Sequence, residues 1–474
     1  MERLHTVDAE FLYLEDASTA MHIASLCVFE GPIPSRAEIT QLYAAKLAQF
    51  PRYRQRVRML PLSLGRPVWI DDPQFDLDYH LRWTAVPSPG DDATLAVLMG
   101  RLMSQLLDRE RPLWESWVVE GLEVGRWALI SKIHHSMVDG VSGTGLLTAL
   151  LDPRPDAPLP SVLPWRPQKE PSRASLVHHA ILDAQRDRLA WTRARIAELG
   201  KPAKTARSLV DLGMGVVRLA ARLRSAPEVS LQGPIGIHRS YVFTSTGLDD
   251  LLMVRKVLGG TLNDVVLAVL AGAYRVLLAH HGDDLNAPIR SLVPVSVRSA
   301  ARHAALDNQV AALLCDMPVH LTDPIERLHF VSAQMSELKA SHMAEASAWL
   351  VSVGDLVPPM LVGPTTKLIA RLMHKLPQRS FSTVTTHVPG PRNALYFLGR
   401  KLVRYYPYVP ISQGTRVGTA ILTYDGQVGF GVSADAESVP DVLLLARAIE
   451  SCAAELVRLA REAGSSAMAA RSEG

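Results

Sequence analysis

A proline-rich stretch divides the chain into two α/β halves. Residues 152–171 contain seven prolines, at positions 153, 155, 158, 160, 164, 167 and 171. Proline removes a backbone donor and clashes inside a helix, so this density excludes a helix or a central strand and predicts a linker. On both sides, apolar runs typical of strands alternate with amphipathic stretches typical of helices. We therefore expect an N-terminal lobe over residues 1–151 and a C-terminal lobe over residues 229–463.

Local signals predict a helix start in the first half and a hairpin near the end of the second. Ser35, with Glu38 three residues later, has the capping-box pattern and predicts a helix over residues 35–48. Asp425-Gly426 lies between two apolar runs of strand character. A two-residue hairpin turn favours this dipeptide because both positions take positive φ, so the pair predicts a tight hairpin.

Two helices are expected to frame the second half. The apolar run over residues 261–281 predicts a long helix, and Gly282 is suited to end it. Charged residues within it, such as Arg275, make it a poor candidate for a membrane span. A closing helix is expected over residues 441–463. The small and polar residues 464–474 predict a disordered tail.

The composition excludes several classes of function. Charged residues make up 20% of the 474 residues, and the formal net charge is only +3. This balance, without a basic segment interleaved with aromatic residues, gives no reason to expect a nucleic-acid partner. Three widely spaced cysteines, Cys27, Cys315 and Cys452, form no disulfide framework or zinc-finger pattern, which favours a reducing compartment such as the cytoplasm. The first residues lack the apolar segment of a signal peptide, so we expect a protein that is soluble or lies on a membrane.

The connecting region, residues 152–228, ends in a basic stretch. Residues 173–224 have the pattern of one or two amphipathic helices and hold eleven Lys and Arg against four Asp and Glu, a surplus of seven positive charges. One interpretation is a solvated helical face packed across the two lobes. The other is attraction to anionic lipid headgroups, to which each basic residue near the surface contributes about 1 kcal/mol.

The strongest functional signal is the segment from His134 to Gly140, which has the pattern HHxxxDG. A strand-like run ends just before it, so His135 is expected at the mouth of a strand, where a substrate can reach it. Histidine changes protonation near neutral pH and can take a proton from an alcohol and return it. Gly140 can adopt positive φ in the tight loop that follows. The pair His178-His179 has similar spacing but lacks the glycine and lies in a helical pattern.

Further blocks, together with HHxxxDG, resemble the bacterial wax ester synthase/diacylglycerol acyltransferase family, in the superfamily of chloramphenicol acetyltransferase and the condensation domains. The blocks follow the family's order: Pro112-Leu113-Trp114, Asn263-Asp264, Pro294 to Arg298, Asn308 to Val310, Val388 to Pro391 and Tyr424 to Gly426. The resemblance extends from Leu4 to about Asp435. It implies an α/β fold of two chloramphenicol acetyltransferase-like lobes, with mixed sheets flanked by helices and an active-site tunnel between the lobes. One departure is His387, where the family usually has Asn.

The resemblance implies roles for the residues of the histidine motif. His135 is the expected general base: it would take the proton of the acceptor hydroxyl as that oxygen attacks a thioester, and then give it to the departing thiolate. His134 would point away from the tunnel and support the site. Asp139 would either orient the imidazole or, as the resemblance favours, hold the loop through an ion pair. Arg298 and Arg58 are the candidate partners.

Two other blocks have alternative interpretations. Asn263 and Asp264 suit simple capping of the helix that they open. The resemblance adds a second role, support of the active centre or of the developing oxyanion. Pro112, Leu113 and Trp114 would ordinarily form a turn followed by a core residue, whereas the resemblance associates them with the acyl-binding region.

Other chemistries fit the motif less well. The segment from Gly140 to Thr144 lacks the final glycine of a GxSxG nucleophile elbow. A zinc site made of His134, His135 and Asp139 would need a tight loop and has no evident apolar surroundings, so no metal is expected. A thioester is already activated, so no cofactor is expected beyond acyl-CoA as co-substrate.

The sequence therefore predicts a long-chain acyl-CoA-dependent O-acyltransferase of neutral lipid synthesis. The acceptor would be diacylglycerol, giving triacylglycerol, or a long-chain alcohol, giving a wax ester. The protein would act in the cytoplasm, peripherally at a membrane or lipid-droplet surface. Two alternatives are an acyltransferase for another hydroxylated metabolite or carrier-bound acyl group, and a non-catalytic lipid-droplet or membrane-associated protein of the same fold. The intact His135, Asp139 and Gly140 argue against the second.

Overall fold

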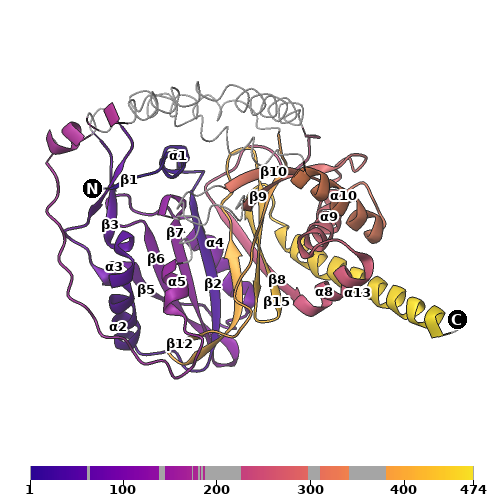
Figure 1. Ribbon diagram of the computed structural model, residues 1–474, viewed down its shortest axis with the longest axis horizontal. Helices are drawn as coiled ribbons and strands as arrows, with labels where there is room; N and C mark the ends of the chain where they lie inside the picture. The colour runs from indigo at the N-terminus through magenta and orange to yellow at the C-terminus, as the bar shows by residue number, and fades with distance from the viewer. Residues whose placement is uncertain are drawn as a thin grey trace, which may run out of the picture.

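The computed structural model describes residues 2–60, 65–137, 145–172, 174–179, 226–296, 310–340 and 380–472, and the single positions Leu182, Gln185 and Arg186. Asp139, Gly140, Arg298 and most of the basic stretch lie outside these residues, so the expectations for them stay predictions. The described residues form two lobes, each built on a six-stranded sheet (Figure 1).

The first sheet is mixed and includes two strands from the C-terminal half. Its order is β12-β13-β2-β7-β6-β5. In that order the strands cover Tyr396–Phe397, Arg400–Tyr408, His22–Glu30, Arg126–His134, Trp114–Leu122 and Leu81–Ala85. β5 and β6 pair in parallel, and the other neighbouring pairs are antiparallel. The small sheet β1-β4-β3 covers Glu2–Arg3, Val68–Asp71 and Gln55–Arg58.

Helices bury both faces of the first sheet. They are α1 (Thr6–Leu14), α2 (Arg36–Lys46), α3 (Leu77–His80), α4 (Asp92–Met103) and α5 (Gly145–Leu150). On β7, Leu129 lies in one apolar cluster with Leu42 of α2, and the next residue, Ile130, lies in another with Met99 of α4. Because successive side chains of a strand point to opposite faces, the run of apolar residues 127–130 in β7 buries apolar side chains on both faces of the sheet. The predicted capping box is confirmed: Ser35 and Glu38 each bond the backbone N–H of the other.

The second sheet has the order β10-β9-β11-β14-β15-β8. In that order the strands cover Val310–Met317, Ile289–Ser296, Thr383–Val388, Val417–Tyr424, Gln427–Asp435 and Arg239–Gly247. β11 is parallel to β9 and β14, and the other pairs are antiparallel. The predicted hairpin is confirmed, since β14 and β15 meet at Asp425 (φ 42°) and Gly426 (φ 77°).

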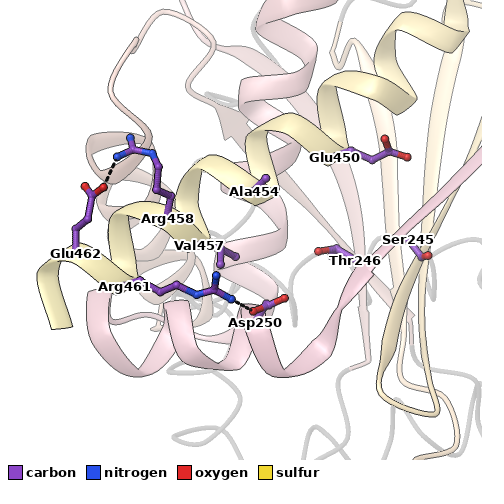
Figure 2. Close-up of a pocket in the computed structure, with 9 residues that line it drawn as sticks. All are labelled: Ser245, Thr246, Asp250, Glu450, Ala454, Val457, Arg458, Arg461 and Glu462. Atoms are coloured by element: carbon purple, nitrogen blue, oxygen red, sulfur yellow. Dashed lines mark hydrogen bonds and ion pairs between the residues drawn. The ribbon is translucent and has the colours of Figure 1, made fainter. Parts of the chain in front are cut away.

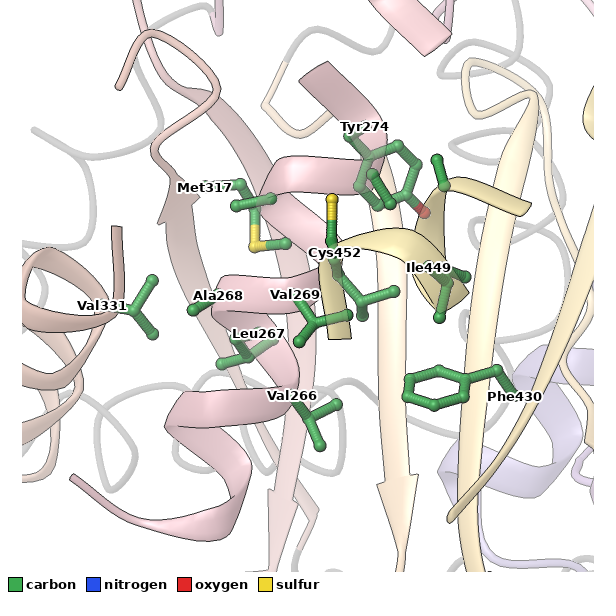
Figure 3. Packing of buried hydrophobic residues seen from close by; sticks show 14 of the residues in the cluster. Val266, Leu267, Ala268, Val269, Tyr274, Met317, Val331, Phe430, Ile449 and Cys452 are labelled. Carbon is green, nitrogen blue, oxygen red and sulfur yellow. The ribbon is translucent and has the colours of Figure 1, made fainter. Parts of the chain in front are cut away.

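The helix α9 (Leu262–His281) forms the centre of the second lobe. Figure 3 shows its Val266 and Val269 among side chains from the sheet and from the other helices, including Phe430 of β15 and Ile449. The other helices are α8 (Leu248–Leu258), α10 (Pro324–Ala340) and α13 (Val442–Ser472). α9 is the one described helix long and apolar enough to cross a membrane, but 72% of its most apolar window is buried inside the lobe. It is therefore a core helix.

Two expectations at the edges of the lobes have different outcomes. Residues 153–172 form no helix or strand, as the prolines predicted, and Asp152 makes a single bridge to Tyr396 of β12. The tail was predicted to be disordered from residue 464, and this is wrong for most of it, because α13 continues to Ser472. The physical reason is composition: the tail contains alanines and Met468, which favour helix once a buried helix provides the first turns.

The two lobes meet along α4 and β8. Tyr241 of β8 lies in the same apolar cluster as Met99 of α4. At Gly100 the helix comes so close to β8 that an added Cβ would lie 2.6 Å from the carbonyl oxygen of Arg239. β13 also connects the lobes. It pairs with β2 in the first sheet, and the carbonyl of its Pro407 accepts a hydrogen bond at 2.8 Å from the hydroxyl of Tyr241 in β8 of the second sheet.

We expect Gly100→Ala to destabilise the protein. Alanine in a helix is normally favoured over glycine by about 0.5–1 kcal/mol. Here the methyl group would collide with a backbone carbonyl, and overpacking of this kind costs about 1–3 kcal/mol. Urea unfolding measures the effect, with Gly464→Ala as control, because a Cβ at that helical position meets only Val257 at an ordinary 3.8 Å. Equal stability of the two variants would contradict the close contact between the lobes.

Candidate active site

The histidine pair lies at the end of the central strand β7, as the sequence predicted. His134 is the last residue of β7 and pairs with His22 of β2. The backbone N–H of His134 donates to the Leu113 carbonyl at 2.9 Å, and that of His135 donates to the Met21 carbonyl at 2.8 Å. Both neighbouring segments therefore fix the main chain here, and a 3₁₀ turn, His135–Met137, begins immediately after β7.

The imidazole of His135 is held neutral by its surroundings. It stacks on Phe11 of α1, with ring centroids 3.9 Å apart and planes 25° apart. Its Nδ1 is buried and has no hydrogen-bond partner among the described residues. Burial lowers the pKa of His135 to about 4, because a charged ring would lose its hydration there. At neutral pH the ring is therefore unprotonated and able to accept a proton.

A shifted acid limit of activity should follow from this environment. A general base works only when it is unprotonated, so activity is lost as pH falls through the pKa of the base. kcat/KM should stay level near pH 6.5, where an ordinary histidine titrates, and fall only as pH approaches about 4. Initial rates across this range measure it, and tryptophan fluorescence at each pH monitors the fold. A fall of kcat/KM around pH 6.5 would mean that His135 titrates like an exposed histidine.

His134 is fully buried and has a defined tautomer. Its Nδ1 lies 2.7 Å from the Ser136 hydroxyl and accepts the Ser136 backbone N–H at 3.1 Å, so the proton sits on Nε2. That Nε2 faces the Glu15 Oε1 at 3.4 Å, a distance longer than a good hydrogen bond. The Nδ1 is therefore engaged as an acceptor, while the buried Nε2 faces the carboxylate without a good hydrogen bond among the described residues.

Glu15 is a buried carboxylate that the sequence analysis missed. Its Oε2 accepts from the Arg109 Nε at 3.0 Å and Nη2 at 2.7 Å, and its Oε1 accepts the Met21 N–H at 3.1 Å. Burial alone would raise the pKa of Glu15, but the contacts with His134 and Arg109 outweigh it and lower the pKa to about 2. The one signal in the sequence was an acidic residue directly after the apolar run of α1.

The segment Pro112-Leu113-Trp114 lies beside the histidines and is buried. Trp114 opens β6 opposite Ile133, the residue before His134. Its side chain is 2% exposed and its Nε1 donates to the Tyr53 carbonyl at 2.8 Å. These contacts match the interpretation as a core residue after a turn. Contact with an acyl chain stays a prediction.

Asn263 and Asp264 have separate roles at the start of α9. Asp264 completes a capping box with Thr261, so one of the two residues does cap the helix. The Asn263 Oδ1 instead lies 3.3 Å from the Nδ1 of His387, the residue that replaces the family's usual Asn. Burial lowers the pKa of His387, so this ring is neutral and its Nδ1–H donates to Asn263. Support of an oxyanion by this pair stays a prediction.

The remaining expected contacts of the motif are not decided by the described residues. Asp139 and Gly140 lie outside them, as does Arg298. Arg58, the other candidate partner of Asp139, is described, and its Nε lies 3.7 Å from the Glu170 carboxylate.

A surface cavity of about 520 Å³ lies away from the histidines, between the end of β8 and the helices α8 and α13 (Figure 2). Four of its charged side chains form ion pairs, Arg461 with Asp250 at 2.8 Å and Arg458 with Glu462 at 2.7 Å, and Glu450 accepts a hydrogen bond from the Thr244 hydroxyl. β8 runs from Arg239, near the loop that precedes β2, to this cavity at its other end. We assign no function to it.

Comparisons with known proteins show the family to which the chain belongs. Residues 4–266 match the model of the wax ester synthase/diacylglycerol acyltransferase catalytic domain, and residues 306–456 match that of the C-terminal domain of the same family. A Mycobacterium tuberculosis protein named probable diacylglycerol O-acyltransferase is 35% identical over 464 residues, which cover 97% of each chain. A Mycobacterium bovis protein named putative diacylglycerol O-acyltransferase is 32% identical and covers 96% of this chain and 99% of its own.

Solved structures confirm the fold class expected from the sequence. The wax ester synthase/diacylglycerol acyltransferase of Marinobacter aquaeolei VT8 superposes with a TM-score of 0.68 at 26% identity and covers 97% of this chain and 99% of its own. The first condensation domain of the calcium-dependent antibiotic synthetase superposes with a TM-score of 0.59 at 15% identity, over 96% of this chain and 97% of that domain, and shares the fold. The chain belongs to the wax ester synthase/diacylglycerol acyltransferase family of acyltransferases.

Proposed function

We propose that the protein transfers a long-chain acyl group from acyl-CoA to the hydroxyl of diacylglycerol, giving triacylglycerol, or of a long-chain alcohol, giving a wax ester. The relatives named as diacylglycerol O-acyltransferases, similar over nearly the whole chain, support the substrate class. The observation that carries the chemistry is the neutral imidazole of His135 at the end of β7, with its pKa lowered to about 4.

The proposed reaction needs one base and no covalent intermediate. His135 accepts the proton of the acceptor hydroxyl while that oxygen forms a bond to the thioester carbonyl carbon. The C–S bond then breaks, and the thiolate of coenzyme A leaves with the proton that His135 returns. A ring that stays neutral between turnovers is ready for the next hydroxyl. Acyl-CoA is a co-substrate, and the proposal includes no cofactor or metal.

The test is acyl transfer by the purified protein. Labelled palmitoyl-CoA is offered with diacylglycerol, hexadecanol, or no acceptor, and both thiol release and the labelled lipid are measured. We expect thiol release to match formation of triacylglycerol, wax ester or both. Thiol release with no esterified product would mean thioester hydrolysis. No reaction with any acceptor would favour the alternative of a non-catalytic protein of this fold.

We further propose that the protein works in the cytoplasm at a membrane or lipid-droplet surface. Acyl-CoA is amphiphilic and the product is an oil, so both favour a lipid surface. The surplus of seven positive charges in residues 173–224 is the element proposed to bind it.

Binding to vesicles should depend on charge and salt. We expect binding to rise with anionic lipid and to weaken with added salt, since such attraction is screened within about 8 Å at physiological ionic strength. Glutamine at positions 186, 188, 193 and 195 should reduce binding in a flotation assay without changing activity on detergent-dispersed substrate. The control replaces four exposed arginines elsewhere: Arg36, Arg255, Arg458 and Arg461. Equal, salt-insensitive binding to neutral and anionic vesicles would contradict the proposal.

A further inference from the structure

The loop between α1 and β2, residues 15–21, closes on itself through one side chain. Glu15 at its start accepts the backbone N–H of Met21 at its end, at 3.1 Å. Arg109 holds the second carboxylate oxygen with two N–H groups, and its Nη2 also donates to the Leu12 carbonyl at 3.0 Å. The Glu15 side chain is only 2% exposed, whereas the side chain of its ion-pair partner Arg109 is 45% exposed. The contact that closes the loop is therefore buried, and Arg109 lies on its solvent side.

The same loop supports His135 from two directions. The Met21 carbonyl accepts the His135 backbone N–H at 2.8 Å. α1, which ends next to Glu15, places Phe11 against the imidazole ring. Glu15 also faces the Nε2 of His134 at 3.4 Å. The carboxylate therefore reaches the backbone that holds His135 and the ring of the residue before it, but it does not reach the imidazole of His135 in the described contacts.

We propose that Glu15 is a positioning residue for the proton transfer by His135, an inference that rests on the proposed function. It favours the Nε2–H tautomer of His134 and fixes the loop whose carbonyl holds the His135 backbone. Arg109 acts through Glu15 by keeping the carboxylate ionised and in place. A base must lie within hydrogen-bond reach of the hydroxyl that it deprotonates, so small displacements of His135 reduce the rate of the chemical step.

The second lobe holds the middle of this loop. The Arg239 guanidinium donates to the Ser18 carbonyl, and the Gln413 side-chain amide donates to the Ser18 hydroxyl at 2.8 Å. Arg239 is 6% exposed and its Nη1 lies 3.7 Å from the Asp435 carboxylate. The loop thus connects the histidine site with the second lobe, and Glu15 is the contact that fixes its two ends.

The first test is Glu15→Gln, which keeps an oxygen for the Met21 N–H but removes the charge. We expect kcat to fall by about 10- to 100-fold with little change in KM for acyl-CoA, because misplacement by about 1 Å can cost about 10²-fold. Glu15→Asp should recover part of the loss, since it restores the charge at a shorter reach. The control is Asp316→Asn, which removes a carboxylate paired with Arg290 at 2.9 Å in the second lobe and should leave kcat unchanged.

A second variant covers the case in which Glu15→Gln fails to fold. The Arg109 side chain is 45% exposed, so Arg109→Gln should fold, and it removes both bonds to Glu15. We expect Arg109→Gln to lower kcat, as Glu15→Gln does. Unchanged kcat in a folded Glu15→Gln or Arg109→Gln protein would overturn the proposal. A loss of activity fully explained by a smaller fraction of folded protein would overturn it as well.

A readout without turnover separates this inference from the proposed function. In the wild type, ¹⁵N spectra of labelled histidines should show His134 protonated on Nε2 and not on Nδ1. Glu15→Gln should shift the ring signals of both His134 and His135, whereas Asp316→Asn should not. Unchanged signals in Glu15→Gln would overturn the positioning role even if the wild type transfers no acyl group. If Glu15→Gln shifts these signals but the wild type transfers no acyl group, only the proposed function is rejected.

Discussion

His135→Ala is expected to lower turnover by about 10²- to 10⁴-fold, the usual contribution of a general base. The variant removes the imidazole of His135, the residue that directly follows β7. The backbone N–H of residue 135 can still donate to the Met21 carbonyl. Folding should therefore be retained. Thiol release and product formation from labelled acyl-CoA measure the effect, with circular dichroism as the check of the fold.

The matched control is His280→Ala. His280 also belongs to a histidine pair, His280-His281, but its side chain is 61% exposed at the end of α9 and lies 3.4 Å from Asp441. It should keep full activity. Near-normal turnover in His135→Ala would remove this residue from the mechanism, and an equal loss in both variants would indicate damage to the fold.

Trp114→Ala is expected to lower the free energy of unfolding by about 3–5 kcal/mol, the usual cost of deleting a fully buried aromatic side chain. Its ring is 2% exposed and stacks on His80, with centroids 4.5 Å apart and planes 12° apart. The substitution leaves a cavity in the cluster that contains Tyr43 and also removes the bond to the Tyr53 carbonyl. Urea unfolding monitored by circular dichroism measures the loss.

This measurement distinguishes the two interpretations of the Pro112-Leu113-Trp114 segment. Trp83→Ala on the neighbouring β5 is the control, because that ring is half-buried with Arg36 over it at 4.7 Å and should cost less. If Trp114→Ala keeps wild-type stability and loses activity on long acyl chains, the residue contacts substrate. If stability falls as expected, its main role is to hold β6 beside the histidines.

Local chemistry accounts for the features that the sequence predicted correctly. A capping box at Ser35 and Glu38 needs residues three apart, and a tight hairpin at Asp425-Gly426 needs two residues that tolerate positive φ. The end of β7 was likewise readable, because an apolar strand changes abruptly to His134 and His135. Each of these features depends on a few adjacent residues and on no distant partner.

The features that were missed depend on distant contacts. Glu15 gains its role from Arg109, His134 and Met21, and nothing in its own neighbourhood indicates which residues will surround it. The split role of Asn263 and Asp264 depends on His387, more than a hundred positions away. The extension of α13 to Ser472 was missed for another reason: a short segment with alanines is too short to be helical alone but can continue a stable helix that precedes it.

The insertion of β13 into the first sheet has a consequence for how the protein is made. β2 pairs with β7 on one side and with β13 on the other. At about 5–20 residues per second, the ribosome needs on the order of tens of seconds to reach Arg400 after completing Glu30. During that time the nascent first sheet has an open, apolar edge at β2, which invites pairing with other chains. The N-terminal half therefore reaches its final structure only after most of the polypeptide has been synthesised, and chaperones that cover strand edges should affect its yield.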